Sequence, residues 1–483
     1  MATQFTSATD LCGQIKAGEL SSVEALRGYI DQVERHDGEI NAVVVRDYER
    51  ALESASAADR RRAGAGSDTV GRLHGLPLTV KESFDICGLA TTWGMKSRET
   101  NFSGQDAETV RRLRAAGAVI FGKTNVPDGL ADHQASSSLF GITNNPWNVG
   151  LTCGGSSGGS AAALAAGFTS LELGSDLGGS LRVPAHFCGV YSHKPSFELI
   201  SARGHSLDAD SAPTDLTVVG PMARSVPDLR LMLEVLMGPD EFDSVGWQIR
   251  LPQARRSDLS QFRVAVLATH RACEIDRGIE SSIRDLANDL RREGVRVDEL
   301  AQLPIDVEAC FQDYMLMTRS IALRRNPPEL LKRLAGEAAT LDPSDTSYRA
   351  ATRRAAGMTH QDWYALNDRR QMFRARWRHF FESYDVLLCP VHASQAFPHN
   401  LQGERENRTL DVNGRPHDYN DSVFWMSIAG LNYLPATVRP VAIANGLPIG
   451  IQIIGPYLED FTTLKFAELL ERIRPRPAYP LER

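Results

Sequence analysis

The sequence predicts an α/β fold in one large domain that carries a helical insertion, and three observations lead to this prediction. Helical and strand-like patterns alternate along most of the 483 residues. Residues 304–382 break this alternation, because they are charged, rich in arginine and helical in pattern. No internal repeat or low-complexity linker divides the chain. We therefore expect a single domain over residues 1–483, with 304–382 as an insertion within it.

The alternation rests on segments that have either helical periodicity or a short apolar run. We expect helices at residues 21–35, 107–116, 160–167 and 226–238 and a helix ending near 292, and strands at 76–80, 119–121, 170–176, 262–270, 384–391, 436–443 and 449–454. The first helix opens with a capping-box pattern, Ser21 to Glu24. The arginine run Arg60–Arg62 is expected in a solvated loop.

Composition and charge exclude several classes of protein. The 42% hydrophobic and 23% charged content is that of an ordinary globular protein. A net charge of −7 argues against nucleic acid as a partner, which needs a concentrated basic face. The N-terminus lacks the pattern of a secretory signal, and no apolar run is long enough for a membrane span. We expect a cytoplasmic protein without a membrane partner, and a homodimer is the candidate assembly.

Metal chemistry is not expected either. The seven cysteines form no CxxC pair and the twelve histidines no HExxH or HxH cluster. We read the cysteines as reduced thiols and predict neither a metal site nor a cofactor.

Two serines in glycine-rich settings stand out in the middle of the chain. Ser156 lies in GGSSGGS, and Ser180 lies in SDLGGS. Glycine lets the main chain turn sharply and approach a substrate closely. The predicted strand 170–176 delivers Asp176 to a turn just before Ser180, so we expect the two serines to converge. The first motif lacks the GKS or GKT ending of a phosphate-binding loop, which argues against a nucleotide site.

The pattern GGSSGGS followed by GSDLGGSLRVPA resembles the signature of the amidase signature family of serine hydrolases. Ser156 and Ser180 are 24 residues apart (180 minus 156), which is the spacing in that family. The segments KTNVP, 123–127, and FGITNNPW, 140–147, are also typical of it. The resemblance covers roughly residues 10–470 and implies a mixed sheet flanked by helices. Cys153 departs from the family pattern, which has proline before GGSSGG.

The resemblance also implies roles for particular residues. Ser180 matches the acylated nucleophile, and Ser156 matches the serine that is held on a cis peptide and relays protons. Lys81 in GLPLTVKES matches the catalytic lysine, with glutamate following it where aspartate is common. Backbone amides of Leu177, Gly178 and Gly179 would form the oxyanion hole. The alternative for Ser180 is helix capping, and the two roles are compatible.

The residues themselves favour lysine as the base. A serine hydroxyl needs a base to attack an amide, and no histidine lies in a known triad motif. A lysine can accept a proton only when burial lowers its pKa from about 10.4. Lys81 follows the apolar run LPLTV, a placement that desolvates it, although most lysines at a strand end reach solvent instead. Asp176 and Arg182 flank Ser180 and are expected to hold the loop, through a structural ion pair or through backbone hydrogen bonds.

Pocket residues are less well specified. Leu130 matches a position that lines the acyl pocket in fatty acid amide hydrolase, a member of the family, and is predicted to contact substrate; the alternative is a plain core leucine. The segment with Phe424, Trp425 and Met426 suits an apolar acyl or amine group if it lines the pocket.

Three functions remain open at this point. The first is an amidase that acts on a small-molecule carboxylic amide, with esters or carbamates as further substrates. The second is the glutaminase subunit of a tRNA-dependent amidotransferase, which uses the same residues and passes ammonia to a partner. The third is a non-catalytic binding protein, which the intact Lys81, Ser156 and Ser180 make the least favoured.

Overall fold

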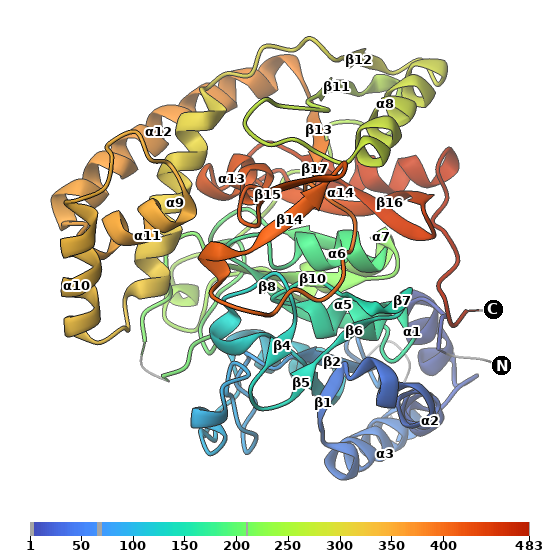
Figure 1. The fold of residues 1–483 in the computed structure, drawn as a ribbon. Coiled ribbons are helices and arrows are strands. Elements are labelled where there is room, and N and C mark those ends of the chain that lie inside the picture. The colour runs from blue at the N-terminus through green and yellow to red at the C-terminus, as the bar shows by residue number, and fades with distance from the viewer. Residues whose placement is uncertain (1–3, 65–69, 209–210, 483) are drawn as a thin grey trace.

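An eleven-stranded mixed sheet forms the centre of the protein (Figure 1). The computed structural model describes residues 4–64, 70–208 and 211–482. In spatial order the strands are β1 (Val43–Arg46), β3 (Val119–Thr124), β2 (Pro77–Lys81), β8 (Leu171–Asp176), β10 (Val218–Ala223), β9 (Tyr191–Lys194), β16 (Ala436–Ala444), β17 (Leu447–Ile454), β13 (Val386–Pro390), β11 (Arg263–Val266) and β12 (Arg296–Asp298). Strands β3, β2 and β8 are parallel, as are β13, β11 and β12, and the remaining pairs are antiparallel.

Helices cover both faces of this sheet. They are α1 (Ala8–Ala17), α2 (Ser22–Ile40), α3 (Tyr48–Gly64), α4 (Glu108–Ala115), α5 (Gly158–Ala165), α6 (Arg182–Cys188), α7 (Val226–Leu236), α8 (Arg277–Arg292), α9 (Val307–Leu323), α10 (Pro328–Ala338), α11 (Tyr348–Ala356), α12 (His360–Ser383), α13 (Val423–Leu431) and α14 (Asp460–Leu469). Side chains alternate between the faces of a strand. In β10, Val219 and Ala223 belong to the core that includes α7, whereas Met222 belongs to the core that includes α5 and α6. The predicted α/β class, with a mixed sheet between helices, is confirmed.

Three small hairpins complete the strands. They pair β4 (Ser136–Ser137) with β5 (Gly141–Ile142), β6 (Asn144–Asn145) with β7 (Asn148–Thr152), and β14 (Thr409–Val412) with β15 (Arg415–Asp418).

The predicted helical stretch 304–382 forms four helices, α9 to α12, which Figure 1 shows together at one side of the sheet. Helix α9 joins this group to the body of the protein by packing on α13. The contact is close because Gly430 has no side chain: a Cβ there would lie 2.6 Å from the Tyr314 ring.

Most predicted elements are present with shifted ends. Helix α2 begins as the capping box requires, since the Glu24 amide donates to Ser21 Oγ at 3.1 Å and the Ser21 amide donates to the Glu24 carboxylate at 2.9 Å. The predicted strand 76–80 is β2, and its last residue is Lys81 itself.

The loop predicted for Arg60–Arg62 was wrong, because α3 continues through these residues. Ala51 and Ala55 anchor the helix to the core, and Arg61 and Arg62 lie in its last turn, where the helix dipole favours positive charge. Strands β9 and β10 were not predicted. Their sequences, YSHK and VVGPMA, are short and lack a clear apolar alternation.

Helix α5 approaches its neighbours closely, which generates a first prediction. A Cβ at Gly159 would lie 2.3 Å from the backbone nitrogen of Asn125. We expect Gly159→Ala to lower the free energy of unfolding by about 1–3 kcal/mol through overpacking. Denaturant unfolding measures this change.

The matched control is Gly13→Ala in α1, where a Cβ has no neighbour within 4 Å. We expect it to raise stability by about 0.5–1 kcal/mol, because alanine favours a helix over glycine. Equal effects of the two substitutions would contradict the packing argument.

Candidate active site

The candidate site lies at the carboxyl ends of two neighbouring parallel strands. Strands β2 and β8 pair in parallel, with Val80 opposite Leu173. Their last residues, Lys81 and Asp176, therefore reach the same edge of the sheet. The Lys81 side chain is fully buried. Its Nζ lies 2.7 Å from Ser156 Oγ and 2.9 Å from Ser175 Oγ, within hydrogen-bonding distance of both hydroxyls.

Burial sets the protonation state of Lys81. It lowers the pKa of the ammonium from its ordinary value to about 7, although the Asp176 and Glu172 carboxyl groups act in the opposite direction. Burial also raises the pKa of Glu172 to about 8, so this neighbour is mostly uncharged at neutral pH. In the described part of the chain no carboxylate lies within ion-pair distance of Lys81 Nζ. A large fraction of Lys81 is therefore a neutral amine near pH 7.

The two serine loops meet as the sequence predicted. The Ser157 amide donates to the Ser180 carbonyl at 3.1 Å and so joins the loops directly. The peptide between Gly155 and Ser156 is cis. A Cβ at Gly155 would lie 2.5 Å from the Asp132 carbonyl oxygen, so only glycine fits there. Ser156 and Ser180 both line one cavity, and Ser180 is 8% exposed.

A buried ion pair supports the loop before Ser180, as predicted. Arg182 Nε and Nη2 donate to the two oxygens of Asp176 at 3.0 and 2.8 Å. Asp176 also accepts from the Gly179 and Leu181 amides at 3.0 and 3.1 Å. Burial acts to raise the pKa of Asp176, but the Arg182 guanidinium and these donors hold it at about 2. Ser180 does not cap α6, which has Leu181 at its N-cap and no side-chain cap bond.

The predicted oxyanion amides differ in availability. The Gly179 amide donates to Asp176, so in this structure it fixes the loop rather than facing the cavity. The carbonyls of Leu177 and Gly178 accept from the Tyr314 hydroxyl and from His133 Nε2, respectively. Residues that the structure describes provide no partner for the amides of Leu177 and Gly178. These two amides stay the candidate donors to an oxyanion.

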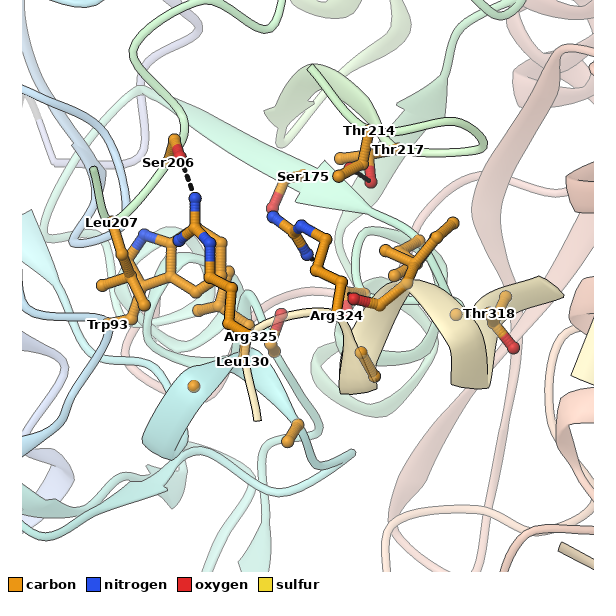
Figure 2. A pocket seen from close by; sticks show the side chains of 18 of the residues that line it. Trp93, Leu130, Ser175, Ser206, Leu207, Thr214, Thr217, Thr318, Arg324 and Arg325 are labelled. Carbon is orange, nitrogen blue, oxygen red and sulfur yellow. Dashed lines mark hydrogen bonds between the residues drawn. The ribbon is translucent and has the colours of Figure 1, made fainter. Parts of the chain in front are cut away.

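A cavity of about 510 Å³ contains Ser156, Ser175 and Ser180 in its wall (Figure 2). Leu130 lines it, and contact of Leu130 with substrate stays a prediction. The segment 424–426 is not part of the cavity lining, so the condition placed on its role is not met. Those three side chains are fully buried in the core, and only the preceding Val423 reaches the cavity.

His133 and His205 line the cavity, and among the described residues neither imidazole makes a hydrogen bond to Ser156, Ser175 or Ser180. His133 Nε2 bonds to the Gly178 carbonyl at 2.8 Å, and burial lowers the pKa of His133 to about 4. Burial and the nearby Lys81 lower the pKa of His205 to about 3. Both imidazoles are therefore neutral and weakly basic. This leaves Lys81 as the basic group within reach of Ser156.

The sequence analysis did not identify Ser175, the second hydroxyl on Lys81, or the two cavity histidines. Ser175 could have been found, because it precedes Asp176 at the end of a predicted strand that must lie beside Lys81. The histidines come from loops, where no periodicity places a side chain.

Metal-binding clusters and membrane spans are both absent from the described residues. These residues contain no group of three or more histidine, cysteine, aspartate or glutamate side chains arranged to hold a metal ion. None of the helices in the described part of the chain is long and apolar enough to cross a membrane.

The Asp176–Arg182 pair leads to a second prediction. Replacing Arg182 by methionine leaves the Asp176 carboxylate buried without its cation, which costs roughly 3–5 kcal/mol of stability. We expect Arg182→Met to unfold at a clearly lower denaturant concentration and to lose activity. Arg35→Met, which removes an exposed helical ion pair with Asp31, is the control and should unfold almost like the wild type. A stable, active Arg182→Met protein would show that the pair does not hold the loop.

Comparison with known proteins places the chain in a family. The Amidase family profile matches residues 24–464. The chain is 32% identical to indoleacetamide hydrolase from Bradyrhizobium diazoefficiens, over 94% of this chain and 84% of that protein. It is 31% identical to one subunit of the glutamyl-tRNA(Gln) amidotransferase from Roseiflexus sp., over 94% of each.

A solved structure of fatty acid amide hydrolase has the same fold. It superposes with a TM-score of 0.82 at 23% identity, over 98% of this chain and 85% of that one. Because the profile covers most of the sequence, the chain belongs to the amidase signature family, whose enzymes hydrolyse amides.

Proposed function

We propose that this amidase cleaves a small carboxylic amide through an acyl-enzyme on Ser180, with Lys81 as base and Ser156 as proton relay. The observation that carries the proposal is the 2.7 Å contact between the buried Lys81 Nζ and Ser156 Oγ, in the wall of the cavity that also contains Ser180. Burial brings the lysine close to neutrality at physiological pH, as a general base requires.

The steps follow from this arrangement. Neutral Lys81 takes the proton of Ser156, which takes the proton of Ser180 as its Oγ attacks the amide carbon. The carbonyl oxygen becomes an oxyanion, and the Leu177 and Gly178 amides donate to it. The proton returns through Ser156 to the departing nitrogen, and the carbon–nitrogen bond breaks. Water, activated by the same relay, then releases the acid and restores Ser180.

The same apparatus acts on esters and carbamates, because their carbonyl carbon is attacked in the same way. Esters need less help from a proton donor, since an alkoxide leaves more readily than an amine anion. We therefore expect esterase activity beside amidase activity. Ammonia or amine release from a panel of aliphatic, aryl and peptide-like amides tests the main activity directly.

The glutaminase alternative draws on the 31% identity to the Roseiflexus amidotransferase chain. It predicts glutamine as the best substrate and copurification with partner proteins. An isolated chain that hydrolyses simple amides and ignores glutamine would exclude it. The predicted homodimer and cytoplasmic location remain predictions, which sedimentation and cell fractionation test.

The nucleophile is tested by Ser180→Ala. We expect the variant to fold and to lose at least ~10³-fold in kcat/KM, because the acyl-enzyme cannot form. A serine-directed phosphonate should add its mass to the peptide that carries Ser180. An adduct on another serine, with Ser180 unmodified, would contradict the assignment.

The base is tested by pH. The pKa of Lys81 is lowered to about 7 and only the neutral amine accepts a proton, so kcat/KM should rise with pH through about 7 and then level off. Lys81→Arg stays charged at every accessible pH and should be inactive. Lys81→Ala should lose much more activity on an amide than on the matched ester.

Glu172→Gln is the control, since Glu172 also titrates in this range, with a pKa of about 8. The variant should keep the rising limb, at the same pH or lower, because the carboxyl group acts to raise the pKa of Lys81. If the limb disappears in Glu172→Gln, or if Lys81→Ala keeps wild-type amide turnover, Lys81 is not the base.

A further inference from the structure

The cavity beside the serines carries more positive charge than amide hydrolysis requires. Asp132 is the one carboxylate that the described residues contribute to its lining, whereas five arginines line it: Arg98, Arg319, Arg324, Arg325 and Arg405. The chain as a whole has a net charge of −7, so the cavity lining is positively charged although the protein is negatively charged overall. A pocket that gathers cations in an acidic protein attracts anionic ligands.

Asp132 does not neutralise these arginines. One of its oxygens accepts from Arg408, which lies outside the lining, at 2.6 Å. The other accepts from the Tyr419 hydroxyl and from the His133 amide, each at 2.7 Å. Both oxygens of Asp132 are therefore already paired with groups other than the five lining arginines.

Arg324 is an exposed arginine of the lining that has no ion pair among the described residues, as is also true of the less exposed Arg319 and Arg405. It follows the last residue of α9, and its Nη1 donates to the Ile321 carbonyl at 2.9 Å. Within the described ranges no carboxylate lies within 4 Å of its guanidinium. Burial and the adjacent Arg325 guanidinium lower the pKa of Arg324, while the Asp208 carboxylate acts in the opposite direction.

Arg325 stands beside it and is only partly paired. It donates to Ser206 Oγ at 3.0 Å and lies 3.3 Å from Asp208. The same Asp208 is 3.4 Å from Arg98, so one exposed carboxylate serves two arginines. Figure 2 shows Arg324 extending into the pocket, with Arg325 and Ser206 to one side of it and Thr214 to the other.

The lining also contains apolar side chains, among them Leu130, Leu207 and Ile321, beside the serines and the arginines. A ligand that fills the cavity thus meets apolar surface as well as guanidinium groups. A guanidinium binds a carboxylate through two parallel hydrogen bonds, which gives direction as well as attraction.

We propose that the enzyme selects amides that carry a carboxylate, bound by Arg324 and Arg325, the two exposed arginines that form the rim of the cavity. This inference rests on the proposed amidase function and defines its substrate class. The carboxylate can belong to the acyl part, as in the monoamide of a dicarboxylic acid, or to the amine part, as in an N-acyl amino acid.

The test compares substrates in which a methyl group replaces the carboxylate. On the acyl side the pair is adipamic acid and hexanamide, and on the amine side it is N-hexanoylglycine and N-ethylhexanamide. We expect kcat/KM to be roughly tenfold higher for the acid in at least one pair, as a charge-assisted hydrogen bond provides. The preference for the acid over the methyl compound should fall as salt is added, because Arg324 and Arg325 are exposed to solvent.

Variants then locate the anion site. Arg324→Gln should lower the acid-to-methyl ratio of kcat/KM by roughly tenfold, and Arg324→Lys should retain part of it, since it keeps the charge without the planar pair of donors. The control is Arg271→Gln, an exposed arginine outside the cavity, which should leave the ratio unchanged. Thermal unfolding confirms that each variant is folded, and the salt dependence of the wild type tests the proposal without any variant.

The outcomes are distinct. If the wild type hydrolyses the methyl compounds as well as the acids, or if Arg324→Gln keeps the wild-type ratio, the anion site is refuted while the amidase function stands. If the wild type hydrolyses no compound in either pair and Ser180 does not react with the phosphonate, the proposed function fails and this inference fails with it.

Discussion

The burial of Lys81 is the constraint on which the site depends. A lysine in a desolvated position is costly unless it is paired with a carboxylate or loses its proton. Here the described residues offer two hydroxyls, Ser156 and Ser175, and the neighbouring Glu172 is itself shifted toward its neutral form. The sheet enforces this arrangement, because Lys81 is the last residue of a strand whose five residues are all buried.

The ion pair of Asp176 and Arg182, at the end of the neighbouring strand, instead keeps two buried groups charged. Its two charges are both buried and are matched by good geometry and by backbone donors, so Asp176 stays ionised. Arg182 also donates to the Met426 carbonyl at 3.1 Å and to Gln452 at 2.6 Å, which ties the Ser180 loop to α13 and β17. The sheet thus carries one lysine kept close to neutral and one fixed ion pair, and the two have different roles.

The sequence predicted the fold class and the serine and lysine positions because each had a local signal. Spaced glycines marked Ser156 and Ser180, and an apolar run marked the strand before Lys81. The availability of the oxyanion amides could not be predicted, since the bond from Gly179 to Asp176 depends on how one turn closes. Nor could the sequence place residues 424–426, because an apolar helix reads the same whether it lines a pocket or fills a core. The rim arginines, Arg324 and Arg325, were not predicted, because they are far along the chain from the loops that form other parts of the cavity wall.

The proposed chemistry and the proposed selectivity belong to different parts of the molecule. The lysine and serines belong to strands and loops of the central sheet, whereas the rim arginines follow α9, in the helical stretch 304–382. The two parts meet at Tyr314 of α9, which donates to the Leu177 carbonyl in the loop before the nucleophile. Gly430 allows this contact by leaving room for the tyrosine ring. A change in the rim therefore alters which substrate enters, while a change at the Tyr314 contact alters the loop that would stabilise the oxyanion. This division explains how one arrangement of lysine and serines can serve amides of different chemistry.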